Sequence, residues 1–178
     1  GYGPDDIFED APVRYGDWAP ENYNGRYEGE MTLERAFARS SNSIAVQVSE
    51  AAGRGWVVRT ARRMGIDSPI QNTHSLALGS YEVTPIELAA AYLPFMNGGR
   101  AVDPHAILTI ETADGTLLFQ HQRVQGDLVL AGRVLGQMEQ LFSATVDYGT
   151  GRGAQVAGRT VRGKTGTTND SRDAWFAG

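Results

Sequence analysis

The run Gly163-Lys-Thr-Gly-Thr-Thr-Asn-Asp170 stands near the end of a chain of 178 residues and is followed by Arg172-Asp-Ala-Trp-Phe-Ala-Gly178. Residues 159–167 predict a strand, and residues 173–176 predict the start of another. A sheet is therefore still being built where the sequence ends. Two strands alone are marginally stable, so we expect partner strands from elsewhere or a larger protein around this chain.

The same lysine also completes a phosphate-binding loop pattern. Gly158 to Thr165 match G-x-x-x-x-G-K-T in full. Such a site needs a buried strand before the first glycine and a helix that begins at the Lys-Thr pair. The preceding stretch, residues 153–157, predicts only a weak strand, and residues 166–170 are poor helix formers. Nucleotide binding is therefore a disfavoured alternative, and it predicts a helix that begins at Lys164.

Composition indicates a soluble globular domain and excludes several kinds of site. Apolar residues make up 41% and charged residues 21% of the chain. The net charge of -5 does not favour nucleic acid as a partner. The absence of cysteine excludes disulfides and thiolate zinc sites. The histidines His74, His105 and His121 lack metal-ligand spacing, so we expect no metal and no cofactor.

The rest of the chain predicts mostly helices. Residues 1–29 are rich in Pro, Gly, Asp and Asn and predict irregular structure. The acidic residues there, Asp5, Asp6, Glu9 and Asp10, are expected to be solvated. Helices are expected over residues 33–39, 43–52, 56–64, 85–96 and 131–148, and a hairpin over residues 107–110 and 116–119 with a turn at Asp114-Gly115.

Thr84-Pro85-Ile86-Glu87 is the strongest local signal for a helix start. A threonine cap, a proline at the first helical position and a glutamate three residues after the cap form a capping box. Ser40-Ser41-Asn42, by contrast, stands between two predicted helices. Taken alone, such a tripeptide is more often a cap and a turn than a functional site.

The longer run around Lys164 resembles the matching stretch of class A penicillin-binding proteins, the bifunctional synthases that polymerise and cross-link peptidoglycan. Lys-Thr-Gly is one signature of serine transferases of this kind. A Ser-x-Asn element precedes it in the family, and Ser40 and Asn42 match that element. Residues 33–46, 76–79, 83–92 and 148–152 also look like the family's sequence and follow its order. A serine β-lactamase is a less favoured relative because the long match follows the synthase pattern.

The resemblance implies an α+β fold and a serine acyl-enzyme mechanism. The fold would be part of the penicillin-binding transpeptidase fold, also found in serine β-lactamases: mainly its helical subdomain, a hairpin and the Lys-Thr-Gly strand. An activated serine would attack a D-Ala-D-Ala stem peptide, D-alanine would leave, and an amine of a second stem would accept the acyl group. β-Lactams would mimic the donor stem.

The resemblance also assigns roles to matched residues. Ser40, Asn42 and Lys164 would be catalytic: Ser40 relays a proton, Asn42 orients the substrate amide and the general base, and Lys164 supplies a positive charge. The substrate-binding residues would be Thr165, Gly166, Thr167 and Thr168. Gly163 and Gly166 would keep the strand clear of side chains for an extended peptide. The Thr167 N–H would be one oxyanion donor.

One element of the family pattern is missing from the sequence. No serine has a lysine three residues later, and Lys164 is the only lysine. The nucleophile would therefore lie outside the chain. We expect residues 1–178 to form a partial transpeptidase domain, truncated at both ends and inactive alone.

The full enzyme would face the periplasm from the inner membrane, held by an anchor outside this chain. Its partners would be stem peptides, β-lactams and the remainder of its own polypeptide. A non-catalytic binding or assembly module remains an alternative, and it predicts no Ser-x-x-Lys element in the complete protein.

Overall fold

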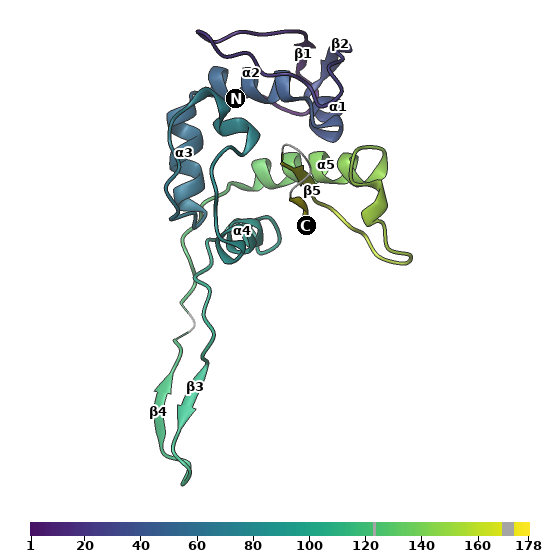
Figure 1. Cartoon of the computed structure of the whole chain (residues 1–178). Helices are drawn as coiled ribbons and strands as arrows, with labels where there is room; N and C mark the ends of the chain where they lie inside the picture. The colour runs from purple at the N-terminus through teal and green to yellow at the C-terminus, as the bar shows by residue number, and fades with distance from the viewer. Residues whose placement is uncertain (123, 169–172) are drawn as a thin grey trace.

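The computed structural model of the chain describes residues 1–122, 124–168 and 173–178. Within them, helices alternate with three two-stranded antiparallel sheets (Figure 1), which confirms the expected α+β fold. The elements in chain order are β1 (Ile7–Asp10), β2 (Gly29–Thr32), α1 (Leu33–Arg39), α2 (Asn42–Ala52), α3 (Arg54–Arg63), η1 (His74–Leu78), α4 (Pro85–Tyr92), η2 (Leu93–Phe95), β3 (Thr109–Glu111), β4 (Leu117–Gln120), α5 (Gly132–Asp147), η3 (Arg152–Ala154), β5 (Lys164–Thr167) and β6 (Ala174–Ala177).

The core lies where the β1–β2 pair meets α1 and α2. Met31, Ala36 and Ile44 form a buried cluster against which Phe8, Leu33 and Val48 pack. A second group of aromatic rings joins α1 to α4, η2 and α5: Phe142 contacts Phe37, Tyr92 and Phe95 at centroid distances of 5.8, 5.7 and 5.1 Å. These contacts hold α5 across the helices.

The predicted helix starts are confirmed where a side chain caps the helix. Thr32 accepts from the Arg35 N–H at the start of α1. At α4, Thr84 and Glu87 form the predicted capping box. Hydrogen bonds from Ser68 and from Thr84 lower the pKa of Glu87 to about 2. The capping box therefore also ties the loop around Ser68 to α4.

The prediction of irregular structure across residues 1–29 is wrong in part. β1 pairs with β2 in an antiparallel register that sets Phe8 opposite Met31. Each strand has only four residues, too few to show a clear alternation of apolar and polar residues. The 18 residues between the two strands also hide their pairing. Asp10, expected to be solvated, is 3% exposed. Pairing and burial both come from contacts with the distant segment around α1.

The predicted hairpin is confirmed as β3 and β4. It extends away from the helices (Figure 1), and every residue of both strands is exposed. The rings of His105 and His121 stack at its base with centroids 3.6 Å apart. Ile110 and Phe119, which face each other across the strands, are 42% and 44% exposed.

The strand predicted over residues 159–167 is shorter than expected. β5 begins at Lys164, and residues 159–163 lie outside it. The stretch predicted as a weak strand, residues 153–157, contains the end of the short helix η3 and no strand. The phosphate-binding alternative is wrong in its structural requirement, because a strand and not a helix begins at Lys164. Residues 169–172 of the quoted run lie outside the described residues.

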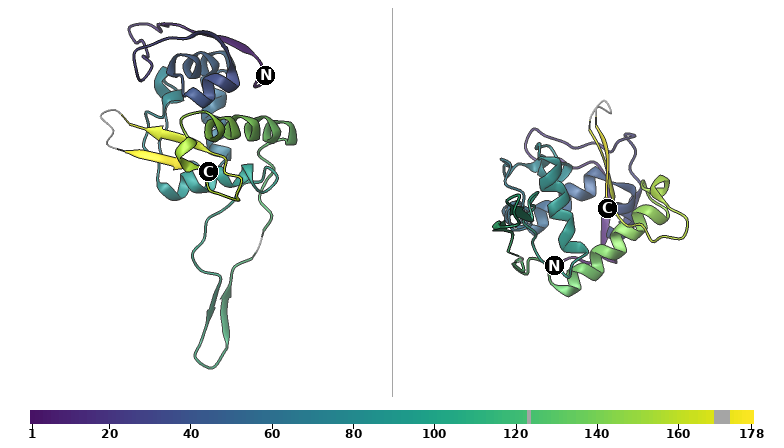
Figure 2. Two further views of the ribbon diagram at one scale, coloured as in Figure 1. Left: turned by 90° about the vertical axis from the view of Figure 1, so that its right-hand side faces the viewer. Right: turned by 90° about the horizontal axis from the view of Figure 1, so that it is seen from below.

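β5 and β6 lie between two helices. β5 contacts α5 and β6 contacts α4 (Figure 2). The register pairs Lys164 with Ala177 and Thr167 with Ala174. This arrangement brings β5 beneath the C-terminal end of α1, more than 120 residues earlier in the chain.

Candidate active site

The turn between α1 and α2 presents Ser40 in an unusual backbone conformation. Its φ and ψ of 59° and 45° lie in the left-handed region. Among the described residues, Ser40 is the one non-glycine residue with positive φ. Its N–H donates to the carbonyls of Ala36 and Phe37 and so ends α1. The hydroxyl is thereby held at the exposed tip of the turn.

Lys164 reaches this turn from β5. Its Nζ donates to Ser40 Oγ at 2.9 Å and to the Thr165 carbonyl at 3.0 Å. Nζ also lies 5.7 Å from the centre of the Phe37 ring, within the range of a cation–π interaction. Burial lowers the pKa of Lys164 to about 8. A lysine with this pKa is charged at neutral pH, yet it can release its proton more easily than an exposed lysine.

The predicted substrate-binding residues line the same pocket. Thr165, Gly166, Thr167 and Thr168 all border it, together with Ser40, Asn42 and Lys164. A Cβ added at Gly166 would meet open space.

Gly163 has a different role from the one predicted. A Cβ there would collide with the Phe176 ring and the Ala177 carbonyl of β6. Gly163 therefore allows close packing against β6, while Gly166 alone leaves room in the pocket.

Asn42 is the first residue of α2 and lines the pocket, but it is not within hydrogen-bonding distance of Ser40 or Lys164. Its side-chain amide donates to the Glu21 carbonyl at 2.7 Å. Its backbone N–H donates to Asn22 Oδ1 at 2.9 Å. The loop before β2 therefore fixes both the backbone and the side chain of Asn42.

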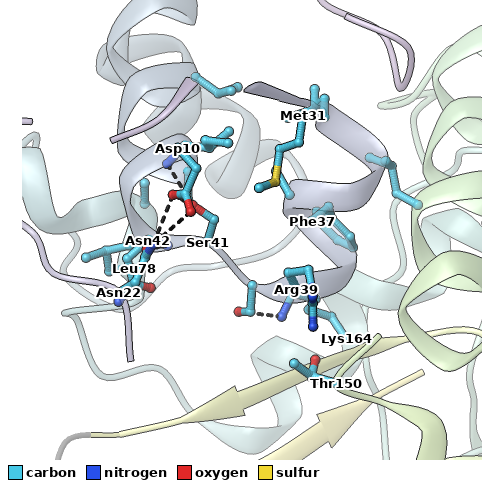
Figure 3. Close-up of a pocket in the computed structure, with 18 of the residues that line it drawn as sticks. Asp10, Asn22, Met31, Phe37, Arg39, Ser41, Asn42, Leu78, Thr150 and Lys164 are labelled. Atoms are coloured by element: carbon cyan, nitrogen blue, oxygen red, sulfur yellow. Dashed lines mark hydrogen bonds between the residues drawn. The ribbon is translucent and has the colours of Figure 1, made fainter. Parts of the chain in front are cut away.

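Three pocket residues were missed from the sequence (Figure 3). Thr150 contacts Thr165 through their hydroxyls at 2.5 Å, and Asp10 and Asn22 lie behind the Ser40-Ser41-Asn42 turn. Thr150 belongs to the quoted stretch 148–152, so the family-like pattern was its only signal. Nothing local marks Asp10 or Asn22, because the turn residues that they contact, Ser41 and Asn42, lie 31 and 20 residues away.

A lysine, several serine and threonine hydroxyls and asparagine side chains thus border a pocket that β5 bounds on one side. No helix of the described residues is both long enough and apolar enough to cross a membrane. A serine hydroxyl in contact with a half-buried lysine can pass a proton, and a threonine-lined strand edge can bind a carboxylate and an extended peptide.

The family described as "Penicillin binding protein transpeptidase domain" matches residues 2–178. The chain therefore belongs to the family of penicillin-binding protein transpeptidase domains.

Within this family the chain is similar to class A members. It is 33% identical to penicillin-binding protein 1A of Rickettsia typhi over all of its own length and 26% of that protein. It is 39% identical to penicillin-binding protein 1A of Neisseria meningitidis over 90% of its length and 21% of that protein. The chain thus spans about a quarter of the curated relatives that it matches.

Solved structures show the same fold. Penicillin-binding protein 1A from Haemophilus influenzae matches 99% of the chain with a TM-score of 0.88 and 26% identity, over 33% of that structure. PonA1 from Mycobacterium tuberculosis, in a complex with penicillin V, matches 99% with a TM-score of 0.86 and 23% identity, over 52% of that structure.

Proposed function

We propose that the full-length protein cross-links peptidoglycan by D-Ala-D-Ala transpeptidation through a serine acyl-enzyme. The observation that carries this proposal is the 2.9 Å contact between Lys164 Nζ and Ser40 Oγ beside an open threonine-lined strand edge. Family membership supports the same activity. β-Lactams would be inhibitors, since they mimic the donor stem.

The reaction has two covalent steps. A serine hydroxyl attacks the carbonyl of the penultimate D-alanine, the peptide bond breaks, and the terminal D-alanine leaves with a proton on its nitrogen. An amine of a second stem then attacks the ester, and the serine recovers its proton. The nucleophilic serine belongs to a Ser-x-x-Lys element, which residues 1–178 do not contain. The remainder of the polypeptide supplies it.

Ser40 and Lys164 act on protons and charge. Ser40 Oγ passes a proton toward the leaving nitrogen. Lys164 donates a hydrogen bond to Ser40 Oγ and so stabilises this oxygen as its proton leaves. The positive charge of Lys164 also attracts the terminal carboxylate of the substrate. Burial makes this charge more effective, because the pocket screens it less than water does.

The β5 edge binds the donor stem. Thr165 and Thr167 offer hydroxyls to the carboxylate, and Gly166 gives the extended peptide room beside the strand. Thr168 directly follows β5 and also lines the pocket. The backbone N–H of Thr167 stabilises the oxyanion, a contribution of about 3 kcal/mol for a donor of this kind. Asn42 orients the substrate amide from the opposite wall.

The family also suggests where the whole protein is located in the cell. We infer that it works at the periplasmic side of the inner membrane, held by an anchor outside residues 1–178, with stem peptides as substrates.

A fluorescent penicillin tests the proposal. The full-length protein is expected to form a stoichiometric covalent adduct, while the isolated chain forms none, because the nucleophile lies elsewhere. A full-length protein that folds but never forms the adduct would favour a non-catalytic binding or assembly module instead.

A further inference from the structure

A buried carboxylate lies directly behind the Ser40-Ser41-Asn42 turn. Asp10 ends β1 and is 3% exposed. Its oxygens accept from Ser41 Oγ at 2.7 Å, from Asn22 Nδ2 at 2.9 Å and from the Glu28 N–H at 2.9 Å. In the described part of the chain, no lysine or arginine forms an ion pair with Asp10. These three donors therefore satisfy the hydrogen-bonding needs of the buried Asp10 carboxylate.

Asn22 extends this contact to the other side of the turn. Its Nδ2 donates to Asp10, and its Oδ1 accepts from the backbone N–H groups of Asn42 at 2.9 Å and Ser43 at 3.3 Å. These N–H groups are at the start of α2, where no carbonyl of the helix can accept from them. Asp10 thus reaches the turn through Ser41 directly and through Asn22 indirectly. Figure 3 shows Asp10, Asn22, Ser41 and Asn42 gathered on one side of the pocket.

The turn needs such support because Ser40 is strained. A non-glycine residue in the left-handed region costs roughly 1–2 kcal/mol. Strain of this kind persists only where the surroundings over-determine the backbone. Ser41 follows the strained residue at once, caps α2 by accepting from the Ile44 N–H at 3.2 Å, and donates to Asp10. The Asp10 contact therefore fixes the side of the turn from which Ser40 projects toward Lys164.

We propose that Asp10 and Asn22 are positioning residues for the Ser40-Ser41-Asn42 turn. Neither contacts the reacting atoms. Asp10 holds Ser41 and Asn22 holds the Asn42 backbone, so that Ser40 Oγ stays within reach of Lys164 Nζ and Asn42 stays at the pocket wall. This inference rests on the proposed transpeptidase function, because it concerns the alignment of its proton relay.

The alternative is that the network only stabilises the fold. The two roles differ in what a lost contact changes. A misaligned relay slows the covalent step after β-lactam has bound, and an error of about 1 Å in position costs up to a hundredfold in rate. A network that only stabilises the fold lowers the melting temperature and leaves the covalent step unchanged at temperatures where the protein is folded.

The test uses the full-length protein and a fluorescent penicillin over a range of concentrations. The time course separates the dissociation constant of the non-covalent complex from the maximal rate of acylation. Asp10→Asn keeps the shape of the side chain but replaces one of its two accepting oxygens with an NH2 group that donates. Asp5→Asn is the matched control, because Asp5 is exposed in the same segment. We expect Asp10→Asn to lower the maximal acylation rate about tenfold to a hundredfold, with little change in the dissociation constant, and Asp5→Asn to act like wild type.

Two further variants keep the inference testable if Asp10→Asn fails to fold. Ser41→Ala removes a single hydroxyl and should reduce the maximal rate in a folded protein. The double variant Asp10→Asn with Asn22→Asp exchanges the two groups, so that residue 10 can donate to residue 22. This exchange should recover part of the lost rate relative to Asp10→Asn.

A wild-type maximal rate in folded Asp10→Asn or Ser41→Ala, with or without a lower melting temperature, would overturn the inference. That outcome is distinct from failure of the proposed function, in which the wild-type full-length protein itself forms no adduct.

Discussion

The Ser40–Lys164 pocket and the β3–β4 hairpin are both built from short segments with clear sequence signals, but their surroundings differ completely. At the pocket, a turn and a strand far apart in the sequence meet over a buried carboxylate and a half-buried lysine. In the hairpin, two strands close together in the sequence pair with each other, and every strand residue is exposed. A local signal is enough to form a hairpin, whereas a site that performs chemistry depends on packing that no local signal reveals.

Lys164→Ala is expected to have the largest effect on the pocket. In the full-length protein it should reduce the rate of acylation by penicillin about 10²–10³-fold, because a charge buried beside the reacting groups is removed. The measurement is the time course of the fluorescent adduct. Arg162→Ala is the control: Arg162 forms an ion pair with Glu139 and is exposed two residues before β5. An equal loss in both variants would contradict a specific role for Lys164.

A pair of truncations in the full-length protein compares the two regions by stability. Ile44 is 1% exposed next to the turn, and Leu118 is 64% exposed in the hairpin. Ile44→Ala should lower the free energy of unfolding by about 2–5 kcal/mol, because it leaves a cavity in the core. Leu118→Ala should change it by less than about 0.5 kcal/mol.

Denaturant unfolding of both variants gives the two values. A large loss for Leu118→Ala would mean that the hairpin is covered in the full-length protein, and the comparison would then hold only for residues 1–178.

Two substitutions of Ser40 measure the strain in the turn between α1 and α2. Ser40→Gly and Ser40→Ala both remove the hydroxyl, but only glycine adopts a φ of 59° without strain. Ser40→Gly should therefore be more stable than Ser40→Ala by about 1 kcal/mol. Thermal unfolding of the two full-length variants measures the difference. Equal melting temperatures would show that the turn relaxes when Ser40 is replaced.

The smallest expected effect is a dependence of stability on pH. Lys164 has a pKa of about 8 in the folded protein, below its ordinary value of 10.5. Between these values the unfolded chain binds more protons than the folded one, so stability rises with pH. Below pH 8 both states are protonated, and the cost of burying the charge is constant.

Comparison with Lys164→Met isolates this effect from other groups. The melting temperature of the full-length protein relative to Lys164→Met should increase as pH rises from about 8 to 10. Parallel curves for the two proteins would contradict the lowered pKa.

Much of the fold could be predicted from the sequence because its signals are local. The Thr84–Glu87 capping box and the Asp114-Gly115 turn each depend on atoms within a few residues. The β1–β2 pair could not be predicted, since it forms only against α1 and α2. Its burial of Asp10 was missed for the same reason.

The residues of the candidate site likewise fall into those that the sequence predicts and those that it does not. Resemblance to a family selected Ser40, Asn42 and Lys164, and the structure places all three at one pocket. Asp10 and Asn22 could not be predicted, because their hydrogen bonds to Ser41 and to Asn42 span 31 and 20 residues and produce no periodic pattern in the sequence. The predicted role of Gly163, to leave room for a peptide, is wrong. A side chain there would collide with the neighbouring strand β6, and the sequence does not show that the two are in contact.

The hydrogen bond between Lys164 and Ser40 joins residues 124 apart in the chain. During synthesis at about 5–20 residues per second, Ser40 emerges on the order of ten seconds before its partner exists. The helices and the hairpin can form in that interval from nearby residues, but the pocket cannot. Closing so long a loop is also a late and slow kind of contact. Under the proposed function, capture of a β-lactam by the nascent protein would therefore report that folding of this segment is complete.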